Sequence, residues 1–341
     1  MKQGLLFMHA NEVGMKVAFF SAQRYEEEIF RSVQQQSQVE FDFIEARLTE
    51  KTVQLAKGYR AICVFVNDIL NEKVLTELHA TGVRFIALRC AGFNNVHLPT
   101  AKKLDLRIVR VPEYSPYAVA EHAVALLLTL NRKTHRAFGR IRDLNFSLEG
   151  LVGFDLYQKT VGVIGTGKIG RVFVNIMKGF GCKILVYDIK TDAEIEKVAT
   201  YVSLDDLLKQ SDVISLHCPL NDNTRHMLDT QAFYSMKKNA IVINTGRGAL
   251  INTRALIEAL KAHKIAGACL DVYEEEEGIF FTDQSNEGIT DDILARLTTF
   301  PNVILTSHQA FLTQEALQNI ADVTTANLVC LLETDHCENE V

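Results

Sequence analysis

The sequence predicts an α/β fold with two parallel-sheet domains, because short apolar runs alternate with helical stretches along almost the whole chain. Many of these runs lack polar alternation, which is typical of strands buried on both faces of a sheet. The length of 341 residues fits about two domains, at roughly 100–200 residues for each.

The first third of the chain contains five predicted strands separated by helical stretches. One helix is expected over 72–81, where Val74, Leu75 and Leu78 share a face. The strands are expected at 17–20, 41–44, 61–66, 85–88 and 108–111. Residues 1–14 precede this pattern, and we interpret them as an N-terminal tail.

A single long helix is predicted over 118–143, after Pro116 and with Glu121 in its first turn. Its first half is strongly apolar and its second half is basic. A helix that is apolar on most sides must be covered. It is either a core helix between domains or a subunit contact, and we favour the subunit contact.

A second alternating series follows and ends in one more helix, expected over 310–332. Six parallel strands joined by crossover helices form a complete dinucleotide-binding fold. The strands are expected at 160–164, 184–187, 213–216, 240–244, 267–270 and 303–305.

The strongest local signal is the glycine pattern GTGKIG at 165–170, which follows an apolar strand and opens a helix. Gly165 permits the tight turn, and Gly170 permits close packing of helix and strand. Gly167 lets the backbone approach a pyrophosphate, which the helix N-terminus attracts. The alternative interpretation is a plain strand-to-helix turn.

Asp188 ends the next predicted strand, 18 residues after Gly170, close to the ~20 expected for a carboxylate that binds ribose hydroxyls. Such a carboxylate repels a 2′-phosphate and therefore favours NAD over NADP. Lys190 lies nearby and weakens this preference.

Three further polar groups follow strand ends, where ligands of parallel sheets bind. Arg247 can hold a carboxylate in a bidentate fork, or it is a surface residue of its loop. His308 suits proton transfer near neutral pH, although a lone histidine is more often structural. The run at 274–277 has four glutamates, and spacing alone does not say which one points inward.

Composition excludes several classes of protein. The net charge of −6 argues against a nucleic-acid partner, and no apolar run reaches the ~20 residues of a membrane span. The seven cysteines form no CxxC pair, so we expect free thiols, no metal site and a cytoplasmic location. The N-terminus lacks the pattern of a signal peptide.

Eight segments together resemble the D-isomer-specific 2-hydroxyacid dehydrogenase family, and most closely its bacterial fermentative D-lactate dehydrogenases. The resemblance covers nearly everything from Met15 to Val341. The segments are LRCAGFNNV at 88–96, VRVPEYSP at 109–116, AVAEH at 118–122, GTGKIG at 165–170, HCPL at 217–220, NTGRG at 244–248, DVYE at 271–274 and HQAFLT at 308–313.

The resemblance implies two Rossmann-like or flavodoxin-like domains with an active-site cleft between them. The discontinuous substrate domain is expected over 15–111 plus 313–341, and the NAD-binding domain over 112–312. The long helix after Pro116 resembles the family's dimerisation arm, which predicts a homodimer or a homotetramer.

The resemblance also implies roles for individual residues in NADH-dependent reduction of pyruvate to D-lactate. His308 is the expected general acid, Glu276 its carboxylate partner and Arg247 the group that binds the substrate carboxylate. The expected substrate contacts are Ala91, Gly92, Tyr114 and Phe311. The expected cofactor contacts are Gly165, Gly167, Lys168, Ile169, Gly170, Asp188, Cys218, Pro219, Thr224, Thr245, Gly246 and Asp271, although many relatives have Asn where this chain has Thr224.

Other functions remain open at this point. Within the family, the substrate could be 2-ketoisocaproate, hydroxypyruvate, glyoxylate or phosphoglycerate, and one methylene changes binding by only ~1–3 kcal/mol. Phosphoglycerate enzymes often carry a C-terminal regulatory domain, whereas this chain ends soon after its last helix. Outside enzymes, the same fold serves as an NAD-sensing corepressor, which the acidic net charge disfavours.

Overall fold

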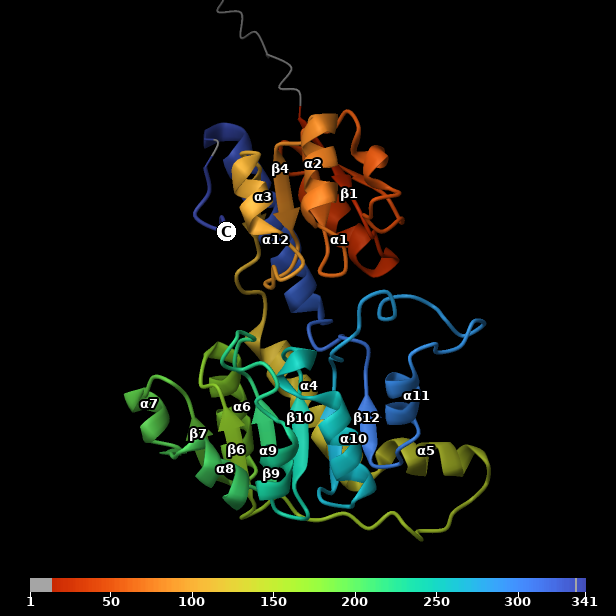
Figure 1. The fold of residues 1–341 in the computed structure, drawn as a ribbon, viewed down its shortest axis with the longest axis vertical. Coiled ribbons are helices and arrows are strands. Elements are labelled where there is room, and N and C mark those ends of the chain that lie inside the picture. The colour runs from red at the N-terminus through yellow and green to blue at the C-terminus, as the bar shows by residue number, and fades with distance from the viewer. Residues whose placement is uncertain (1–13, 335) are drawn as a thin grey trace, which may run out of the picture. The chain divides into compact units, whose positions relative to one another are not determined.

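The computed structural model describes residues 14–334 and 336–341, and the chain divides into two compact units (Figure 1). The first unit combines the chain up to Tyr114 with Thr313–Val341, and the second comprises Ser115–Leu312. The observed division follows Tyr114, whereas the resemblance placed it after Val111. The predicted N-terminal tail lies outside the described residues, except for Gly14.

The first unit is built on a five-stranded parallel sheet with the order β2-β1-β3-β4-β5, which is the flavodoxin-like order. All five predicted strands are confirmed, with ends that differ by up to two residues. The strands are β1 (Met15–Phe19), β2 (Val39–Phe43), β3 (Ala61–Val64), β4 (Phe85–Leu88) and β5 (Arg107–Arg110). The helices are α1 (Arg24–Gln34), η1 (Val53–Ala56), α2 (Glu72–Thr81), α3 (Leu98–Lys103) and α12 (Gln314–Thr334).

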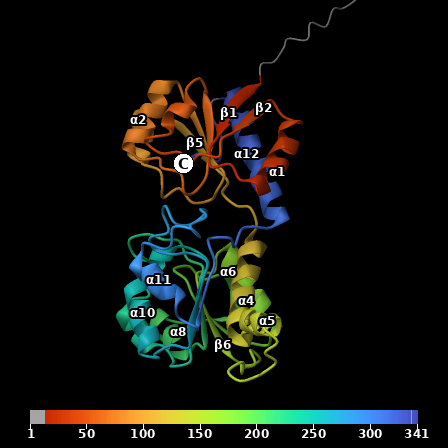
Figure 2. The same cartoon turned by 90° about the vertical axis from the view of Figure 1, so that its right-hand side faces the viewer.

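Helices cover both faces of this sheet. The predicted apolar face of α2 packs with α3 against one face, in a core that includes Ile62, Ile86 and Leu75. On the other face α12 lies beside α1 and contacts β4 and β5, as Figure 2 shows. Because both faces are covered, strands of this sheet such as β3 and β4 are buried along their whole length.

A buried ion pair joins Arg89, the residue directly after β4, to Glu26 of α1 in the first unit. The Arg89 side chain is fully buried, and its Nε and Nη2 atoms donate to the two carboxylate oxygens of Glu26, both at 3.0 Å. Its guanidinium also lies 4.2 Å from the ring centroid of Phe19. No pattern in the sequence indicates this pair, because the partners are far apart along the chain.

The second unit contains a seven-stranded parallel sheet with the order β12-β11-β10-β9-β6-β7-β8, and the strand order reverses between β6 and β9. All six predicted strands are confirmed. The strands are β6 (Thr160–Ile164), β7 (Lys183–Tyr187), β8 (Thr200–Tyr201), β9 (Val213–Leu216), β10 (Ile241–Asn244), β11 (Gly267–Leu270) and β12 (Val303–Leu305). The helices are α4 (Pro116–Arg132), α5 (Thr134–Arg142), α6 (Lys168–Gly179), α7 (Ala193–Glu196), α8 (Leu204–Gln210), α9 (Thr230–Ser235), η2 (Gly248–Leu250), α10 (Thr253–Lys261) and α11 (Asp292–Thr298).

The helices of the second unit also form two layers on the sheet. One face packs against α8, α9, α10 and α11, and the other against α4 and α6 (Figure 2). Ala123, Leu127 and Leu130 of α4 are buried in the second of these cores. The chain's own sheet therefore covers the apolar side of α4. The apolar character of α4 alone thus gives no reason to expect a contact with another subunit.

Three predictions about the second unit are wrong in detail. Helix α4 begins at Pro116, so Glu121, which was expected in the first turn, lies in the second turn. The helix predicted over 118–143 is interrupted at Lys133, whose φ of +53° is left-handed and ends α4 before α5 begins. The short edge strand β8, at Thr200–Tyr201, is missing from the prediction. Two residues are too few to produce a recognisable pattern.

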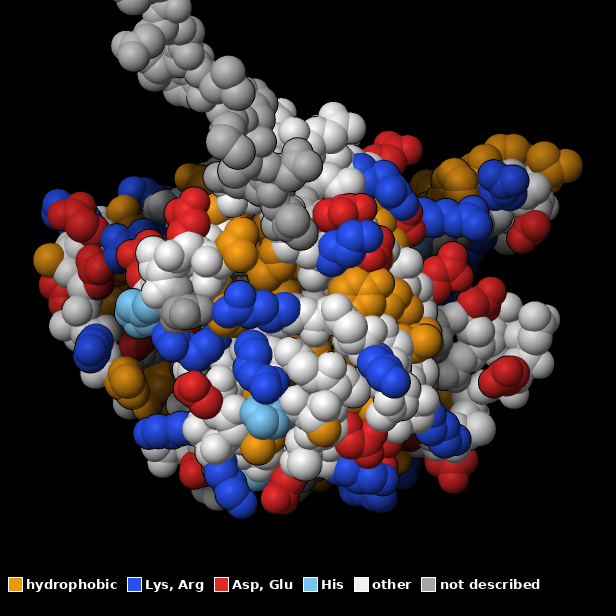
Figure 3. Space-filling model, turned by 90° about the horizontal axis from the view of Figure 1, so that it is seen from above, with side chains coloured by type: hydrophobic (Ala, Val, Ile, Leu, Met, Phe, Trp, Pro, Cys, Tyr) orange, Lys and Arg blue, Asp and Glu red, His pale blue; other side chains and the backbone are white. Residues whose placement is uncertain are grey.

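The described residues carry neither a membrane span nor a preformed metal cluster. Within 14–334 and 336–341, no helix combines the length and apolarity that a bilayer span requires. In the same ranges no group of three or more His, Cys, Asp or Glu side chains is arranged to hold a metal ion. On the face drawn in Figure 3, basic and acidic side chains are interspersed.

The ion pair between Glu26 and Arg89 predicts a large loss of stability in Glu26→Ala. Removing Glu26 leaves the buried Arg89 without its hydrogen-bonded carboxylate, and breaking a buried pair costs about 3–5 kcal/mol. Urea denaturation followed by circular dichroism measures the change. The control is Glu50→Ala, because Glu50 pairs with Lys73 on the surface. Equal losses in the two variants would contradict this account of the buried pair.

Candidate active site

The glycine turn joins β6 to α6 at the point where the strand order reverses. Gly165 has a φ of +95°, and a Cβ there would lie 2.6 Å from the backbone nitrogen of Cys218. A Cβ on Gly170 would lie 2.0 Å from the carbonyl oxygen of Gly165. A Cβ on Gly167 would meet nothing within 4 Å. Gly165 and Gly170 therefore maintain packing within the protein, whereas Gly167 leaves open space at the helix N-terminus, where an anion binds.

Asp188 follows β7 and faces the same turn. Its Oδ2 atom accepts from the backbone nitrogen of Thr166 at 2.6 Å and from the Thr166 hydroxyl at 3.0 Å. Burial alone raises the pKa of this carboxyl group, but hydrogen bonds from Thr166 and Lys190 lower it below its usual value. The group is thus ionised beside the glycine turn. Lys168 and Ile169 begin α6 directly after Gly167.

The loop after β9 lies against the glycine turn through the backbone of Cys218. The Thr224 hydroxyl donates to the carbonyl oxygen of Pro219 at 2.7 Å and accepts from the backbone nitrogen of Asn221 at 2.8 Å. The hydroxyl of Thr224 thus closes the turn that Pro219 begins. Its only proton is used within the loop, so a contact between Thr224 and a cofactor stays a prediction.

The loop after β10 is held by Asn244, a residue to which the sequence analysis gave no role. The Asn244 side chain accepts from the backbone nitrogen of Gly246 at 3.0 Å and donates to the carbonyl oxygen of Arg247 at 2.9 Å. An asparagine that bonds the backbone two residues ahead is a known turn signal. The Thr245 hydroxyl is buried without a hydrogen-bond partner in the described part of the chain, which fits a position that meets a polar ligand.

Two glutamates of the run face inward, and the structure shows which of them contacts His308. Glu274 is half-buried, and its carboxylate accepts from the Thr253 hydroxyl at 3.1 Å. Glu275 and Glu277 are exposed. Glu276 accepts from His308, with 2.8 Å between its Oε1 atom and the Nδ1 atom of the imidazole. The pairing that the resemblance implied for Glu276 is thus present in the structure.

The hydrogen bond to Glu276 defines the roles of the two nitrogens of His308. A carboxylate only accepts, so Nδ1 carries the proton of this bond, and Nε2 is left to exchange a proton with a ligand. The second oxygen of Glu276 accepts from the backbone nitrogen of Tyr273 at 3.2 Å, which fixes its orientation. A carboxylate oriented in this way supports an imidazole acting as an acid or base.

His217 lies at the same edge of the sheet as His308 but has different surroundings. Burial lowers the pKa of His217 to about 3, its Nε2 atom is 2.8 Å from the Ser215 hydroxyl, and its ring packs on Phe173 at 5.0 Å between centroids. A histidine with so low a pKa is neutral near pH 7 and carries no proton on its second nitrogen to give to a ligand. Of these two histidines, His308 is the one suited to proton transfer.

Phe281 contacts the predicted acid and was not found from the sequence. Its ring lies 5.8 Å from that of His308, measured between centroids, with 36° between the planes. No pattern around Phe281 indicates this contact, because it depends on how the loop after Glu276 folds. Phe311, predicted to line the substrate pocket, follows the His308 turn and is almost entirely buried.

The remaining predicted substrate contacts belong to the first unit. The loop containing Ala91 and Gly92 follows β4, and the Ala91 carbonyl oxygen accepts from the Arg110 side chain at 2.8 Å. The Tyr114 carbonyl oxygen accepts from the Asn319 side chain at 2.7 Å. The roles of Ala91, Gly92 and Tyr114 in binding substrate stay predictions.

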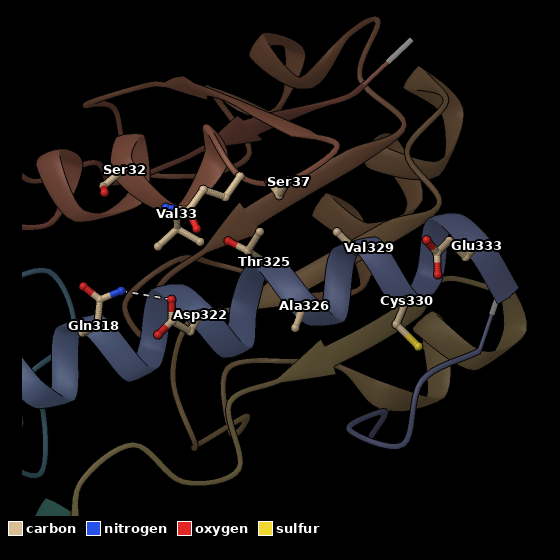
Figure 4. Close-up of a pocket in the computed structure, with 11 residues that line it drawn as sticks. Ser32, Val33, Ser37, Gln318, Asp322, Thr325, Ala326, Val329, Cys330 and Glu333 are labelled. Atoms are coloured by element: carbon tan, nitrogen blue, oxygen red, sulfur yellow. Dashed lines mark hydrogen bonds between the residues drawn. The ribbon is translucent and has the colours of Figure 1, made fainter. Parts of the chain in front are cut away.

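A groove of about 490 Å³ between α1 and α12 is a separate feature of the first unit. Figure 4 shows Val33, Asp322 and Cys330 among its lining residues, with Asp322 hydrogen-bonded to Gln318. None of the residues predicted from the sequence as site residues lines this groove.

In the second unit, the predicted groups meet at one edge of the parallel sheet. In neighbouring strands, Asn244 pairs with Leu270 and Leu270 with Leu305, so Arg247, Asp271 and His308 all follow strand ends that lie side by side. The glycine turn follows β6 at the same edge. Residues 124–310 match the family model for the NAD-binding domain of D-isomer specific 2-hydroxyacid dehydrogenases.

The chain belongs to the D-isomer specific 2-hydroxyacid dehydrogenase family. It is 50% identical over 328 residues to D-lactate dehydrogenase of Escherichia coli, covering 96% of this chain and 100% of the relative.

Solved structures of the family agree with this assignment. The apo structure of the E. coli enzyme is similar with a TM-score of 0.88 at 48% identity, covering 96% of this chain and all of the other. A structure described as the NAD-complexed form of a family member from Lactobacillus delbrueckii ssp. bulgaricus has a TM-score of 0.77 at 32% identity, covering 96% and 100% of the two chains. The protein is an NAD-dependent dehydrogenase.

Gly167 and Gly170, two of the three glycines of the turn, predict separable effects of adding a methyl group. Gly167→Ala should fold normally, because its Cβ meets open space, but should weaken NADH binding about tenfold or more by blocking the close approach of the pyrophosphate. Gly170→Ala should lower the melting temperature, because its Cβ collides with the carbonyl oxygen of Gly165. Fluorescence titration with NADH and thermal unfolding separate the two. Unchanged NADH binding in Gly167→Ala would contradict this placement of the pyrophosphate.

Proposed function

We propose that this family member reduces pyruvate to D-lactate with NADH, using His308 as the general acid. The observation that carries the proposal is the hydrogen bond of 2.8 Å between His308 Nδ1 and Glu276 Oε1. It is supported by the 50% identity to a D-lactate dehydrogenase over nearly the full length of both chains.

In this proposal, His308 donates its Nε2 proton to the carbonyl oxygen of the keto acid. The bound nicotinamide supplies the hydride that reduces the carbonyl carbon. Glu276 stabilises the imidazolium before the transfer and keeps Nδ1 protonated afterwards, so that the proton always leaves from Nε2. Positioned proton transfer of this kind accelerates reactions about 10²–10⁴-fold.

Arg247 is proposed to bind the substrate carboxylate and to support the charge that develops on the carbonyl oxygen. Its guanidinium is only half-buried, and one nitrogen donates to the carbonyl oxygen of Gly246 at 2.8 Å. This bond uses one of its five donors and leaves a fork that matches a carboxylate. The backbone amides of Ala91 and Gly92 are proposed to complete the carboxylate site.

The proposal predicts that His308→Asn lowers kcat for pyruvate about 10²–10⁴-fold while NADH binding stays unchanged. Asparagine tolerates the left-handed backbone at this position, where φ is +54°. NADH oxidation followed at 340 nm measures turnover. The matched control is His263→Asn, since His263 is exposed and also has a positive φ, of +49°.

The same assay with 2-ketoisocaproate, hydroxypyruvate and glyoxylate tests the substrate. A clear preference for pyruvate, with D-lactate as the product, supports the full proposal. A preference for a larger keto acid would change the substrate but retain the mechanism. A His308→Asn enzyme within twofold of the wild type would refute the assignment of the acid. Tight NADH binding without turnover of any keto acid would favour the corepressor function.

We also propose that the protein self-associates through α5 and the segment that follows it. This part of the chain exposes large apolar side chains, including Phe138, Phe146, Leu148 and Val152, with exposed fractions of 66–84%. Large exposed apolar side chains gathered in one segment are typical of interaction sites. A second copy of this chain is the proposed partner, in a homodimer or a homotetramer.

The proposed association predicts that Phe146→Asp combined with Leu148→Asp reduces the molar mass in solution to that of one chain, 38.2 kDa. Charged side chains disfavour burial in an apolar interface. Size-exclusion chromatography with light scattering measures the mass. Leu55→Asp is the control, because Leu55 is an exposed leucine of the first unit, 48% accessible. A wild-type mass of one chain would contradict the proposal.

A cytoplasmic location is the remaining part of the proposal. None of the seven cysteines forms a disulfide bond, and thiols persist in a reducing compartment. Burial raises the pKa of the Cys218 thiol, near the glycine turn, to about 11, which keeps it protonated and unreactive at neutral pH.

A further inference from the structure

The turn that carries His308 is organised by a single buried residue, Asp271. The Asp271 carbonyl oxygen accepts from the backbone nitrogen of His308 at 2.7 Å. The Asp271 carboxylate accepts from the backbone nitrogens of Gln309 at 2.9 Å and Ala310 at 2.8 Å. Three consecutive amides of the turn therefore point at one residue, whose side chain is fully buried.

These hydrogen bonds hold His308 in an unfavourable backbone conformation. Its φ of +54° lies in the left-handed region, which residues with a Cβ adopt at a cost in free energy. Such a conformation persists only when the surrounding structure enforces it, and it is typical of functional sites. The position of the imidazole thus depends on Asp271 remaining a good acceptor on both oxygens.

A further side chain, that of His122 on α4, also contacts the Asp271 carboxylate. Its Nε2 atom lies 3.1 Å from the Thr306 hydroxyl oxygen and 3.3 Å from the Oδ1 atom of Asp271. Thr306 donates its only proton to that same Oδ1 at 2.5 Å. The hydroxyl is therefore left as an acceptor towards His122, so His122 Nε2 must be the donor.

The donors around Asp271 keep its carboxylate ionised in a buried place. Burial alone raises the pKa of this carboxyl group, but four hydrogen bonds outweigh burial and lower the pKa below its usual value. The donors are the side chains of His122 and Thr306 and the backbone nitrogens of Ala310 and Gln309. An ionised carboxylate keeps both oxygens available to the His308 turn.

We propose that His122 is a positioning residue for His308: it donates to Thr306 and Asp271 and thereby maintains the acceptor that holds the catalytic turn. This inference rests on the proposed role of His308 as the general acid. His122 lies on α4, a helix that packs against β11 and β12. It does not contact the substrate in this proposal and acts only through its hydrogen bonds to Thr306 and Asp271. The family resemblance includes His122 in the segment AVAEH at 118–122 but implied no role for it.

The test compares two substitutions of His122. His122→Gln retains a side-chain N–H donor, whereas His122→Leu removes it and fills a similar volume. We expect His122→Leu to lower kcat for pyruvate about tenfold or more, because small displacements of a catalytic group cost up to ~10²-fold. The KM for pyruvate and the Kd for NADH should stay within about threefold. His122→Gln should recover most of the lost kcat.

Two matched variants sharpen the test. Glu121→Gln changes the exposed neighbour on the same helix and should have no effect. Thr306→Val removes the hydroxyl that relays the hydrogen bond and should reproduce the loss seen in His122→Leu. Combining Thr306→Val with His122→Leu should cost less than the product of the single losses, because both act on the same carboxylate.

Imidazole NMR of ¹⁵N-histidine-labelled protein supplies a measurement that does not need turnover, with His308→Asn used for assignment. The Nδ1–H signal of His308, hydrogen-bonded to Glu276, should shift or broaden in His122→Leu and persist in His122→Gln and Glu121→Gln. If the wild type reduces no keto acid, the proposed function fails, but this signal still tests the positioning role.

Several results would overturn the inference. One is an unchanged His308 signal in His122→Leu. Another is a kcat within twofold of the wild type in that variant. A third is an equal loss in His122→Leu and His122→Gln, accompanied by parallel losses of NADH affinity and melting temperature. That last pattern would show that His122 only anchors α4 to the sheet.

Discussion

The candidate active site depends on one buried charge, the carboxylate of Asp271 at the carboxyl end of β11. Removing such a group from water is costly unless it is fully hydrogen-bonded. Here the compensation comes from groups that must be placed accurately, namely the His308 turn, the Thr306 hydroxyl and the His122 side chain. Satisfying the carboxylate and placing the imidazole are thus the same structural requirement.

The parallel sheet brings these groups within reach of one another. Strands that run in the same direction end at a common edge, and the reversal of strand order between β6 and β9 opens that edge to a ligand. The loops at this edge also brace each other. A Cβ on Gly248 would lie 2.1 Å from the backbone of Tyr273, so the loop carrying Arg247 packs directly on the loop carrying Glu276.

Much of this arrangement was predictable because it is encoded locally. The glycine turn, the strand ends at Asp188 and Asp271 and the series of buried strands are visible as short patterns. The choice of Glu276 from four glutamates came from the family resemblance, since spacing along the chain did not decide it. The structure supplies the physical reason, because the loop after β11 turns Glu276 toward His308 and Glu274 toward Thr253.

The sequence by itself determined the two parallel-sheet domains, the dinucleotide turn and the family, because these depend on hydrophobic periodicity and on residues close together along the chain. Only the tertiary structure decided the break at Lys133, the contact of Phe281 with His308 and the contacts of His122 and Glu26. Each of the three contacts joins residues brought together by folding, and the break at Lys133 is a backbone conformation that its side chain does not favour. Local pattern carries no information about such choices.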